Sequence, residues 1–137
     1  MTLSVDIARR VGTADFTFAF DAPSAGLTAL AGPSGDGKTT CINLIAGMLR
    51  PDRGRIALGD HVLFDATAGV DLAPDRRNVG YVFQDATLFP HMTVRDNLAY
   101  PLDTRGEREP ARAQRIARMM DLVELPQAYL DKYPKHL

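Results

Sequence analysis

Apolar and polar side chains alternate over residues 3–7 and again over residues 16–20. This period of two predicts two half-buried strands near the start of the chain. Two further short strands are predicted over residues 55–58 and 61–64, because a Gly-Asp pair of the kind found in tight turns joins them. The first part of the chain is therefore expected to contain an antiparallel sheet.

Two apolar runs without a clear polar face predict strands of a different kind. Residues 27–31 and 79–83 are rich in apolar and β-forming side chains. Such runs are typical of strands that are buried on both sides of a parallel sheet. The stretch from Pro23 to Gly26 predicts a turn before the first run, and residues 66–74 predict a polar loop.

Three segments carry the apolar spacing of helices. Residues 39–49 predict one helix, Thr93 is a candidate cap for a second helix that runs through Leu98, and residues 111–123 predict an amphipathic third. The expected buried positions are Ile42, Ile45, Ala46 and Leu49 in the first helix and Ile116, Met119, Met120 and Val123 in the third. Strands dominate before about residue 90 and helices after it, so a boundary is predicted near Pro90.

Composition excludes several classes of protein. Of the 137 residues, 45% are hydrophobic and 24% are charged, which is ordinary for a globular domain. The net charge of −1 gives no basic excess, so no nucleic-acid partner is expected. There is no apolar run of about 18 residues, and the first ten residues lack the apolar core of a signal peptide. The single cysteine, Cys41, fits a reducing compartment, and the expected location is the cytoplasm.

The stretch from Gly32 to Thr39 reads GPSGDGKT and matches the phosphate-loop pattern G-x-x-x-x-G-K-[ST] without a mismatch. Glycines let the backbone curl so that its N–H groups face phosphate oxygens, and the helix that follows adds the positive end of its dipole. Lys38 offers a charge for the β- and γ-phosphates, and the Thr39 hydroxyl offers a ligand for Mg²⁺. The expected binding residues are Gly32, Pro33, Ser34, Gly35, Asp36, Gly37, Lys38, Thr39 and Thr40. The pattern predicts a nucleoside triphosphate, but kinases, GTPases and transport ATPases all share it.

A second segment narrows the class. Residues 79–100 read VGYVFQDATLFPHMTVRDNLAY, and together with the loop this segment resembles the ATP-binding subunits of ABC transporters. In that family a strand ends in a glutamine, here Gln84, and is followed by Leu-Phe-Pro-His and by a helix with Thr-Val-x-x-Asn, here ending at Asn97. The resemblance covers essentially the whole chain. It implies an α/β fold: a P-loop NTPase (ABC ATPase) core with an N-terminal antiparallel β subdomain over residues 1–90, and the start of an α-helical subdomain over residues 91–137, the whole being incomplete.

The resemblance also implies roles for individual residues. Lys38 and Gln84 would be catalytic in an ATPase that uses ATP and Mg²⁺, with Thr39 and Gln84 contacting the metal and Gln84 also contacting the attacking water. The segment from Asp85 to Met92 would receive a short helix of a transmembrane permease subunit. Phe83, Leu88 and Phe89 could equally be ordinary core, and Gln84 could simply end an edge strand. The family works as a homodimer of ATPase subunits, peripheral on the inner, cytoplasmic face of the membrane.

Within the family the chain resembles the molybdate-importer ATPases most. The segment RRVGTADFTFAFDAPSAGLTALAGPSGDGKT fits them, as do Leu63-Phe64-Asp65 and the Arg76-Arg77 pair before GYVFQ. The implied function is ATP-driven import of an oxyanion, molybdate. Importers of sulfate, polyamines and sugars share parts of these patterns and remain alternatives.

Two positions depart from the family pattern. Many members carry an early aromatic residue that stacks on adenine; Phe16 is the candidate here, but it fits an interior strand position equally well. Asp36 stands where the family usually has a small neutral residue. Because a carboxylate near a triphosphate would repel it, the side chain of Asp36 is expected to point to solvent.

The last residues read YPKHL, and in the family this point is followed by the signature motif. The signature, the aspartate that holds Mg²⁺ through water, the water-activating glutamate and the switch histidine are not among these residues. This chain alone is therefore expected to bind MgATP weakly, to show little turnover and to have open sheet edges. The alternatives are a truncated, non-hydrolysing ATP-binding or docking module, or a small kinase, in which Gln84 and the Leu-Phe-Pro-His block would have no role.

Overall fold

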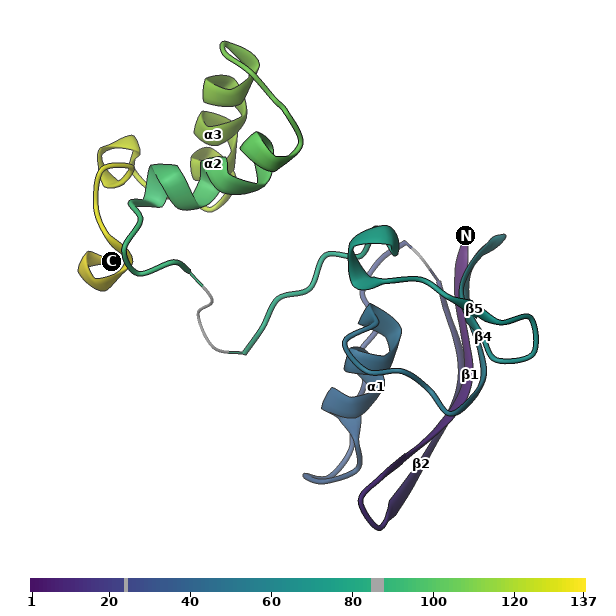
Figure 1. Ribbon diagram of the computed structural model, residues 1–137. Helices are drawn as coiled ribbons and strands as arrows, with labels where there is room; N and C mark the ends of the chain where they lie inside the picture. Colours follow the sequence, from purple (N-terminus) through teal and green to yellow (C-terminus); the bar gives the residue numbers. More distant parts are fainter. Residues whose placement is uncertain (24, 85–87) are drawn as a thin grey trace. The chain divides into compact units, whose positions relative to one another are not determined.

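The computed structural model describes residues 1–23, 25–84 and 88–137. The chain forms two compact units, Met1–Val82 and Phe83–Leu137 (Figure 1), and each has a hydrophobic core of its own. The predicted boundary near Pro90 falls inside the second unit, and the assignment of residues 1–90 to a nucleotide-binding core and of residues 91–137 to the start of a helical subdomain remains a prediction. Among the described helices, none is both long and apolar enough to cross a membrane.

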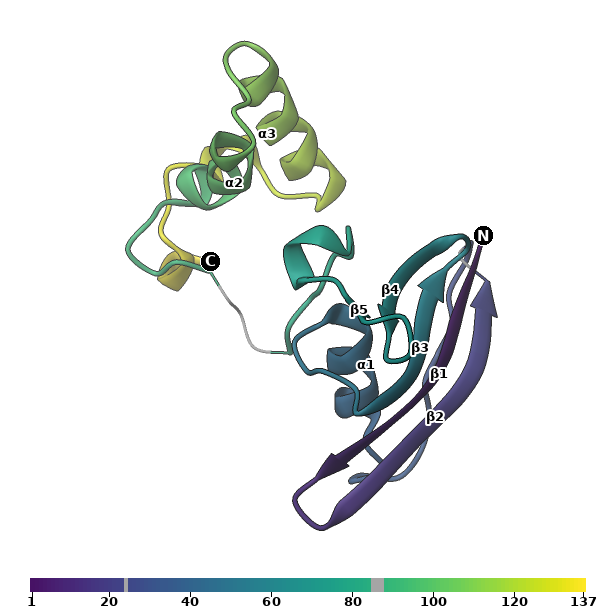
Figure 2. The same cartoon turned by 45° about the vertical axis from the view of Figure 1, so that its right-hand side comes forward.

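The first unit is built on an antiparallel sheet of five strands with the order β2-β1-β3-β4-β5 (Figure 2). The strands are β1 (Thr2–Val11), β2 (Ala14–Pro23), β3 (Arg53–Leu58), β4 (His61–Asp65) and β5 (Val70–Asp71). The four predicted antiparallel strands are confirmed. The short β5 and the 3₁₀ turn Pro74–Arg76 overlap the segment that was predicted to be a polar loop over residues 66–74.

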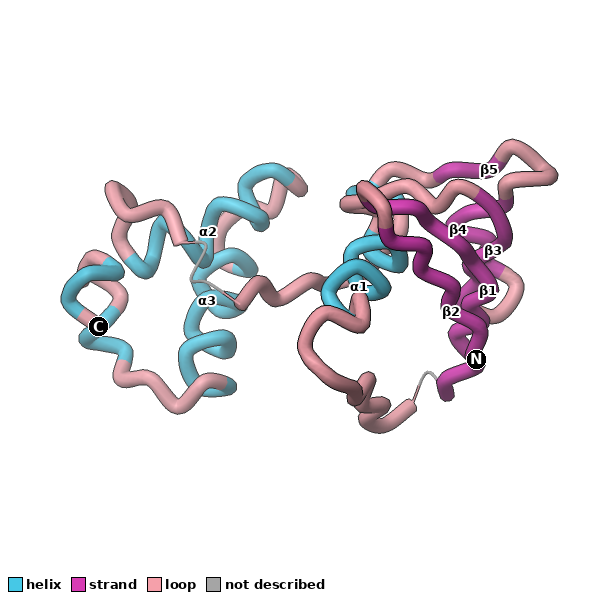
Figure 3. The backbone as a smooth tube through the Cα atoms, turned by 90° about the horizontal axis from the view of Figure 1, so that it is seen from below, coloured by secondary structure: helices cyan, strands magenta, loops and turns pink. Residues whose placement is uncertain are grey.

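The core of this unit lies between the sheet and helix α1 (Lys38–Ala46), which covers one face of the strands (Figure 2; Figure 3). Val5 and Ile7 point to that face because strand side chains alternate, and both are buried. Their cross-strand partners on β2, Phe20 and Phe18, are half-buried and pack against the same cluster. The alternation read in the sequence therefore marks the side of the sheet that carries α1.

Helix α1 ends three residues earlier than predicted. Gly47 adopts the left-handed conformation with φ 83° and its N–H bonds to the Leu44 carbonyl, which closes the last turn. The predicted inward face is also partly wrong, since Ile42 is 46% exposed whereas Cys41 and Leu44 are fully buried. Cys41 thus behaves as a small buried hydrophobe, and burial raises the pKa of its thiol.

The prediction of strands over residues 27–31 and 79–83 is wrong. Neither run forms a strand, and Leu27 and Val82 are almost fully exposed, at 97% and 96%. A strand that is buried on both sides needs neighbouring strands and covering elements, and all the pairing among the described strands is antiparallel within β1 to β5. The turn predicted from Pro23 to Gly26 includes residue 24, which lies outside the described residues.

The second unit is helical. Helix α2 (Val94–Thr104) begins at the predicted cap Thr93, and it continues past the predicted end at Leu98 with Pro101 inside it. Helix α3 (Ala111–Leu122) is confirmed, although Val123, predicted to be buried, lies after the helix and is 59% exposed. The buried core of the unit is formed by Val94, Ala99, Leu102, Ile116, Met120 and Leu130. Two 3₁₀ turns, Gln127–Tyr129 and Pro134–His136, complete it.

Candidate functional site

The glycine loop before α1 contains backbone conformations that glycine adopts readily and other residues rarely do. Gly35 and Gly37 adopt φ values of 95° and 80°, in the region that other residues rarely enter. A Cβ atom on Gly37 would also lie 2.4 Å from Cδ1 of Phe16. The bare backbone of the loop is therefore packed directly against an aromatic ring of β2, and a larger residue at position 37 would not fit.

The start of α1 is chemically open to an anion. Gly37 is the N-cap residue, so no side chain accepts from the first turn, and the first turn contains no acidic residue. The first intrahelical bond is Cys41 N–H to the Gly37 carbonyl at 2.7 Å. The earlier N–H groups have no intrahelical acceptor and carry the positive end of the helix dipole. A phosphate group suits this position because it supplies both the acceptors and the charge.

Lys38 places its ammonium group over the beginning of the loop. Its Nζ donates a hydrogen bond to the Gly32 carbonyl at 2.7 Å and another to the Pro33 carbonyl. An ammonium group has three N–H donors, and these two carbonyls use two of them. The charge is thus held within the loop, beside the open start of α1.

A hollow of about 280 Å³ lies at the loop. Its lining consists of Phe16, Ser34, Gly35, Gly37, Lys38, Thr39 and Thr40. Phe16 is half-buried and stacks on Phe18, with ring centroids 6.2 Å apart and an interplanar angle of 6°. The ring therefore borders both the strand interior and the loop, and its role as an adenine platform remains a prediction.

Asp36 is exposed, as expected, but its carboxylate turns back over the loop. A Cβ atom on Gly32 would lie 3.0 Å from Oδ2 of Asp36. The negative charge thus sits near the first glycine of the loop. A carboxylate in that place opposes the attraction of Lys38 for phosphate, and solvent exposure limits the effect.

Gln84 belongs to the second unit, whereas the loop belongs to the first, so the two are described separately. Gln84 is exposed and lies in a bend, not at the end of the predicted strand. Residues 85–87, the first three of the expected permease contact from Asp85 to Met92, lie outside the described residues. The catalytic and metal-binding roles of Gln84 remain predictions.

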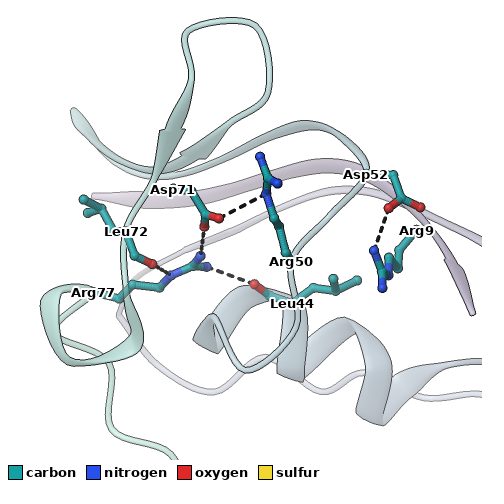
Figure 4. A network of polar contacts seen from close by, with 7 residues as sticks. All are labelled: Arg9, Leu44, Arg50, Asp52, Asp71, Leu72 and Arg77. Carbon is teal, nitrogen blue, oxygen red and sulfur yellow. Dashed lines mark hydrogen bonds and ion pairs between the residues drawn. The ribbon is translucent and has the colours of Figure 1, made fainter.

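Arg77 binds the C-terminal end of α1, a role that was not predicted from the sequence. The side chain is only 1% exposed, and its Nε donates to the Leu72 carbonyl at 2.8 Å (Figure 4). Nη1 donates to the carbonyls of Leu44 and Ile45 at 2.9 Å each, and Nη2 pairs with Asp71 at 3.2 Å. Burial lowers the pKa of Arg77, and Asp71 acts in the opposite direction. The guanidinium group thus caps the C-terminal carbonyls of α1, where a cation is favourable.

The surroundings of Arg77 are shaped to hold it. A Cβ atom on Gly47 would lie 2.5 Å from Nε of Arg77, so the glycine that ends α1 also makes room for the arginine. Arg50 approaches the other oxygen of Asp71 at 3.1 Å and shares its charge. In the sequence, Arg76 and Arg77 look alike, and no local pattern distinguishes the exposed one from the buried one. Helix α1 is therefore fixed at its end and left open at its start.

A glycine loop, an uncapped helix start and a lysine over the loop together define the phosphate-loop class of nucleotide-binding proteins. A family model described as ABC transporter matches residues 17–137. The chain therefore belongs to the ABC transporter family. This result confirms the family that the loop and the segment around Gln84 predicted.

Several curated proteins resemble the chain over most of its length. The molybdenum import ATP-binding protein ModC of Rhodospirillum rubrum is 48% identical over 98% of the chain, and that of Photobacterium profundum is 40% identical, also over 98%. The matches cover 35% and 36% of these two relatives, so the chain spans about a third of their length.

Solved structures resemble the fold. The ATP-binding cassette MJ0796, in a dimeric post-hydrolysis state bound to ADP and Pi, matches 100% of the chain and 63% of its own length with a TM-score of 0.68. A second dimeric structure of the same cassette gives a TM-score of 0.65. The sequence identities are 22% and 21%, so these matches support the cassette fold and carry no argument about individual residues.

Proposed function

We propose that the chain is the nucleotide-binding part of the ATP-binding subunit of an ABC importer, and that the imported ion is an oxyanion, molybdate. The observation that carries the proposal is the open start of α1 at a loop shaped by Gly35 and Gly37, with the ammonium group of Lys38 beside it. The choice of molybdate is supported by the relatives named molybdenum import ATP-binding proteins.

The loop backbone and a few side chains beside it bind different parts of MgATP. The backbone N–H groups of the loop and of the first turn of α1 hold the β- and γ-phosphates of ATP, and Lys38 holds the same oxygens by charge. The hydroxyl group of Thr39, which is exposed beside the hollow, ligates Mg²⁺. When bound, Mg²⁺ neutralises charge that develops on the phosphate oxygens. Phe16, which lines the hollow, is the candidate platform for the adenine ring.

The remaining parts of the proposal concern the complete importer. Gln84 contacts Mg²⁺ and orients the attacking water, and a side-chain amide suits this because it adds no charge. The segment from Asp85 to Met92 contacts the transmembrane permease subunit. A second copy of the ATPase subunit completes a homodimer on the cytoplasmic face of the membrane. ATP binding closes the two copies, and hydrolysis reopens them and drives transport.

Uptake of molybdate tests this function directly. The full-length subunit would be expressed with its permease in cells that lack molybdate uptake of their own, and the uptake of molybdate, sulfate and a polyamine would be compared. The proposal predicts ATP-dependent uptake of molybdate that Lys38→Ala abolishes and that Lys135→Ala, an exposed lysine outside the loop, leaves intact. Uptake of sulfate or a polyamine in place of molybdate would contradict the choice of substrate.

A variant of Gln84 tests the role of the second segment. Gln84→Ala is expected to leave nucleotide binding unchanged, because the loop residues that hold the phosphates lie elsewhere in the chain. Its hydrolysis of ATP coupled to transport is expected to fall. If coupled hydrolysis stayed at the wild-type rate, Gln84 would lose its proposed role while the loop kept its own.

A further inference from the structure

Asn97, in the first turn of α2, holds the backbone of the segment before the helix. The two N–H donors of its Nδ2 group are shared among the carbonyls of Phe89 at 3.1 Å, Met92 at 3.2 Å and Thr93 at 2.9 Å. Its Oδ1 atom accepts from the N–H group of Phe89 at 2.8 Å. A primary amide is the short uncharged group that both donates and accepts in this way. One side chain thus binds both ends of the turn formed by residues 89–92.

The turn also carries a backbone bond of its own, from the Met92 N–H to the Phe89 carbonyl at 3.1 Å. The start of α2 does not need Asn97 to cap it. Thr93 and Asp96 form a capping box, in which each side chain accepts from the backbone N–H of the other residue. The hydrogen bonds from Asn97 to Phe89 therefore hold the conformation of the turn and do not cap the helix. We call residues 89–92 the docking turn.

The docking turn displays aromatic groups to solvent. Phe89 is 40% exposed and Tyr100 is 49% exposed, with ring centroids 5.0 Å apart. The exposed ring of His91 lies edge-on to Phe89 at 6.0 Å. None of these residues belongs to the buried core of the helical unit. Exposed aromatic rings held in a fixed arrangement are typical of the central contacts of protein interfaces.

We propose that Asn97 is a positioning residue that fixes the docking turn for the permease subunit. This inference rests on the proposed function, in which residues 85–92 contact that subunit. Asn97 acts through Phe89 and does not touch the nucleotide. The turn itself, Phe-Pro-His-Met, carries no acidic residue, lysine or arginine. The partner segment is therefore an apolar stretch of the permease that meets the Phe89 and Tyr100 rings.

The test uses the full-length subunit and its permease in detergent or lipid nanodiscs. Two quantities are measured: the affinity of the subunit for the permease, and the ATP hydrolysis of the subunit alone. Asn97→Ala removes the four hydrogen bonds, and Asn97→Asp keeps the shape but turns a carboxylate toward three carbonyl oxygens. Asp96→Ala is the matched control, because it weakens the same helix start without touching the docking turn.

Both Asn97 variants are expected to lower the affinity for the permease about tenfold, the loss that follows when a contact group is no longer held in its bound shape. Their hydrolysis of ATP without permease is expected to match the wild type, and Asp96→Ala is expected to keep the wild-type affinity. A merely structural role would lower both quantities together, which would overturn the inference.

Two further outcomes separate the inference from the function on which it rests. If Phe89→Ala loses affinity but both Asn97 variants keep it, the contact is real and the positioning role of Asn97 is wrong. If the wild-type subunit does not bind a permease at all, the proposed function fails and the inference falls with it.

Discussion

Helices α1 and α2 begin in opposite ways. Helix α1 begins after Gly37, with no side-chain cap and no acidic residue in its first turn. Helix α2 begins after Thr93, whose Oγ1 accepts from the Asp96 N–H at 3.1 Å and donates to the Asp96 carboxylate at 2.6 Å. One helix start is closed by the chain itself, and the other is left open.

The charges at the two helix starts are opposite. At α2, hydrogen bonds from Thr93 hold the pKa of Asp96 below its usual value, so the carboxylate stays ionised beside the positive end of the dipole. At α1 the first helical residue is Lys38, whose ammonium group is held over the loop and adds to the positive end of the dipole. A helix start of that kind is stabilised when an anion binds from outside, and this is the physical basis for the proposed phosphate site.

The C-terminal end of α1, unlike its start, is capped by the buried side chain of Arg77. Arg77→Ala would leave the carbonyls of Leu44 and Ile45 without their buried donor and is expected to cost about 3 kcal/mol of unfolding free energy. Thermal or urea unfolding measures the loss. Arg76→Ala is the control, since that side chain is exposed and its loss is expected to cost little. Equal effects of the two variants would show that the buried contacts of Arg77 do not stabilise α1.

A methyl group on Gly37 tests the shape of the open start. Gly37→Ala combines the strain of a φ of 80° with a collision against the ring of Phe16, and it is expected to cost about 2 kcal/mol and to weaken ATP binding. Gly69→Ala is the matched control, because Gly69 also has a positive φ, of 69°, but has no atom within 4 Å of the added Cβ. Calorimetric titration with ATP compares the two. If both variants bound ATP alike, the packing of Phe16 on the loop would not matter for binding.

A carboxylate introduced into the first turn of α1 would give this helix start a negative charge like the one at the start of α2. Thr40→Glu places a negative charge in the first turn, where it stabilises the helix and repels phosphate, and about a tenfold weaker affinity for ATP is expected. Thr40→Gln has the same size without the charge, so it measures the loss of the Thr40 side chain alone, and Thr40→Glu is expected to bind ATP more weakly than Thr40→Gln. Both affinities come from the same titration. An unchanged affinity in Thr40→Glu would mean that the phosphates do not lie at this helix start.

Opening the start of α2 is expected to have the smallest effect. Thr93→Ala removes the cap and is expected to cost about 1 kcal/mol of stability, with no change in ATP binding. Thr93 lowers the pKa of Asp96 in the folded state, so the part of the cap that depends on the ionised Asp96 carboxylate is present above the unfolded pKa of about 4 and is lost as the pH falls through the lower folded value. Unfolding curves of both proteins between pH 7 and pH 3 are the measurement. A stability difference that did not shrink at low pH would show that Asp96 plays no part in the cap.

Local signals in the sequence predicted what depends on a few neighbouring residues. The capping position of Thr93, the turn between β3 and β4 and the alternation in β1 are all set by near neighbours, and the structure confirms them. The glycine loop is also a local pattern. Its backbone conformation at Gly35 and Gly37 agrees with the pattern, and the binding roles of its residues remain predictions.

Contacts between distant residues could not be predicted in the same way. The strands expected over residues 27–31 and 79–83 depend on neighbours that no local pattern supplies, and they are not formed. Phe16 packs against Gly37, and Arg77 donates a hydrogen bond to the Leu44 carbonyl. Both contacts join residues that are far apart in the sequence. An arginine next to another arginine reads as a solvated charge, and only the fold shows which of the two is buried.

The most direct measurement of the central claim is the affinity of the protein for MgATP with and without the charge of Lys38. Isothermal titration calorimetry would compare the wild type, Lys38→Ala and the control Lys135→Ala under one set of conditions. The account predicts saturable binding by the wild type and the control, and binding at least about tenfold weaker in Lys38→Ala, because a charge-assisted contact to phosphate is lost. Equal affinity of Lys38→Ala and the wild type would contradict the assignment of this loop as the phosphate site.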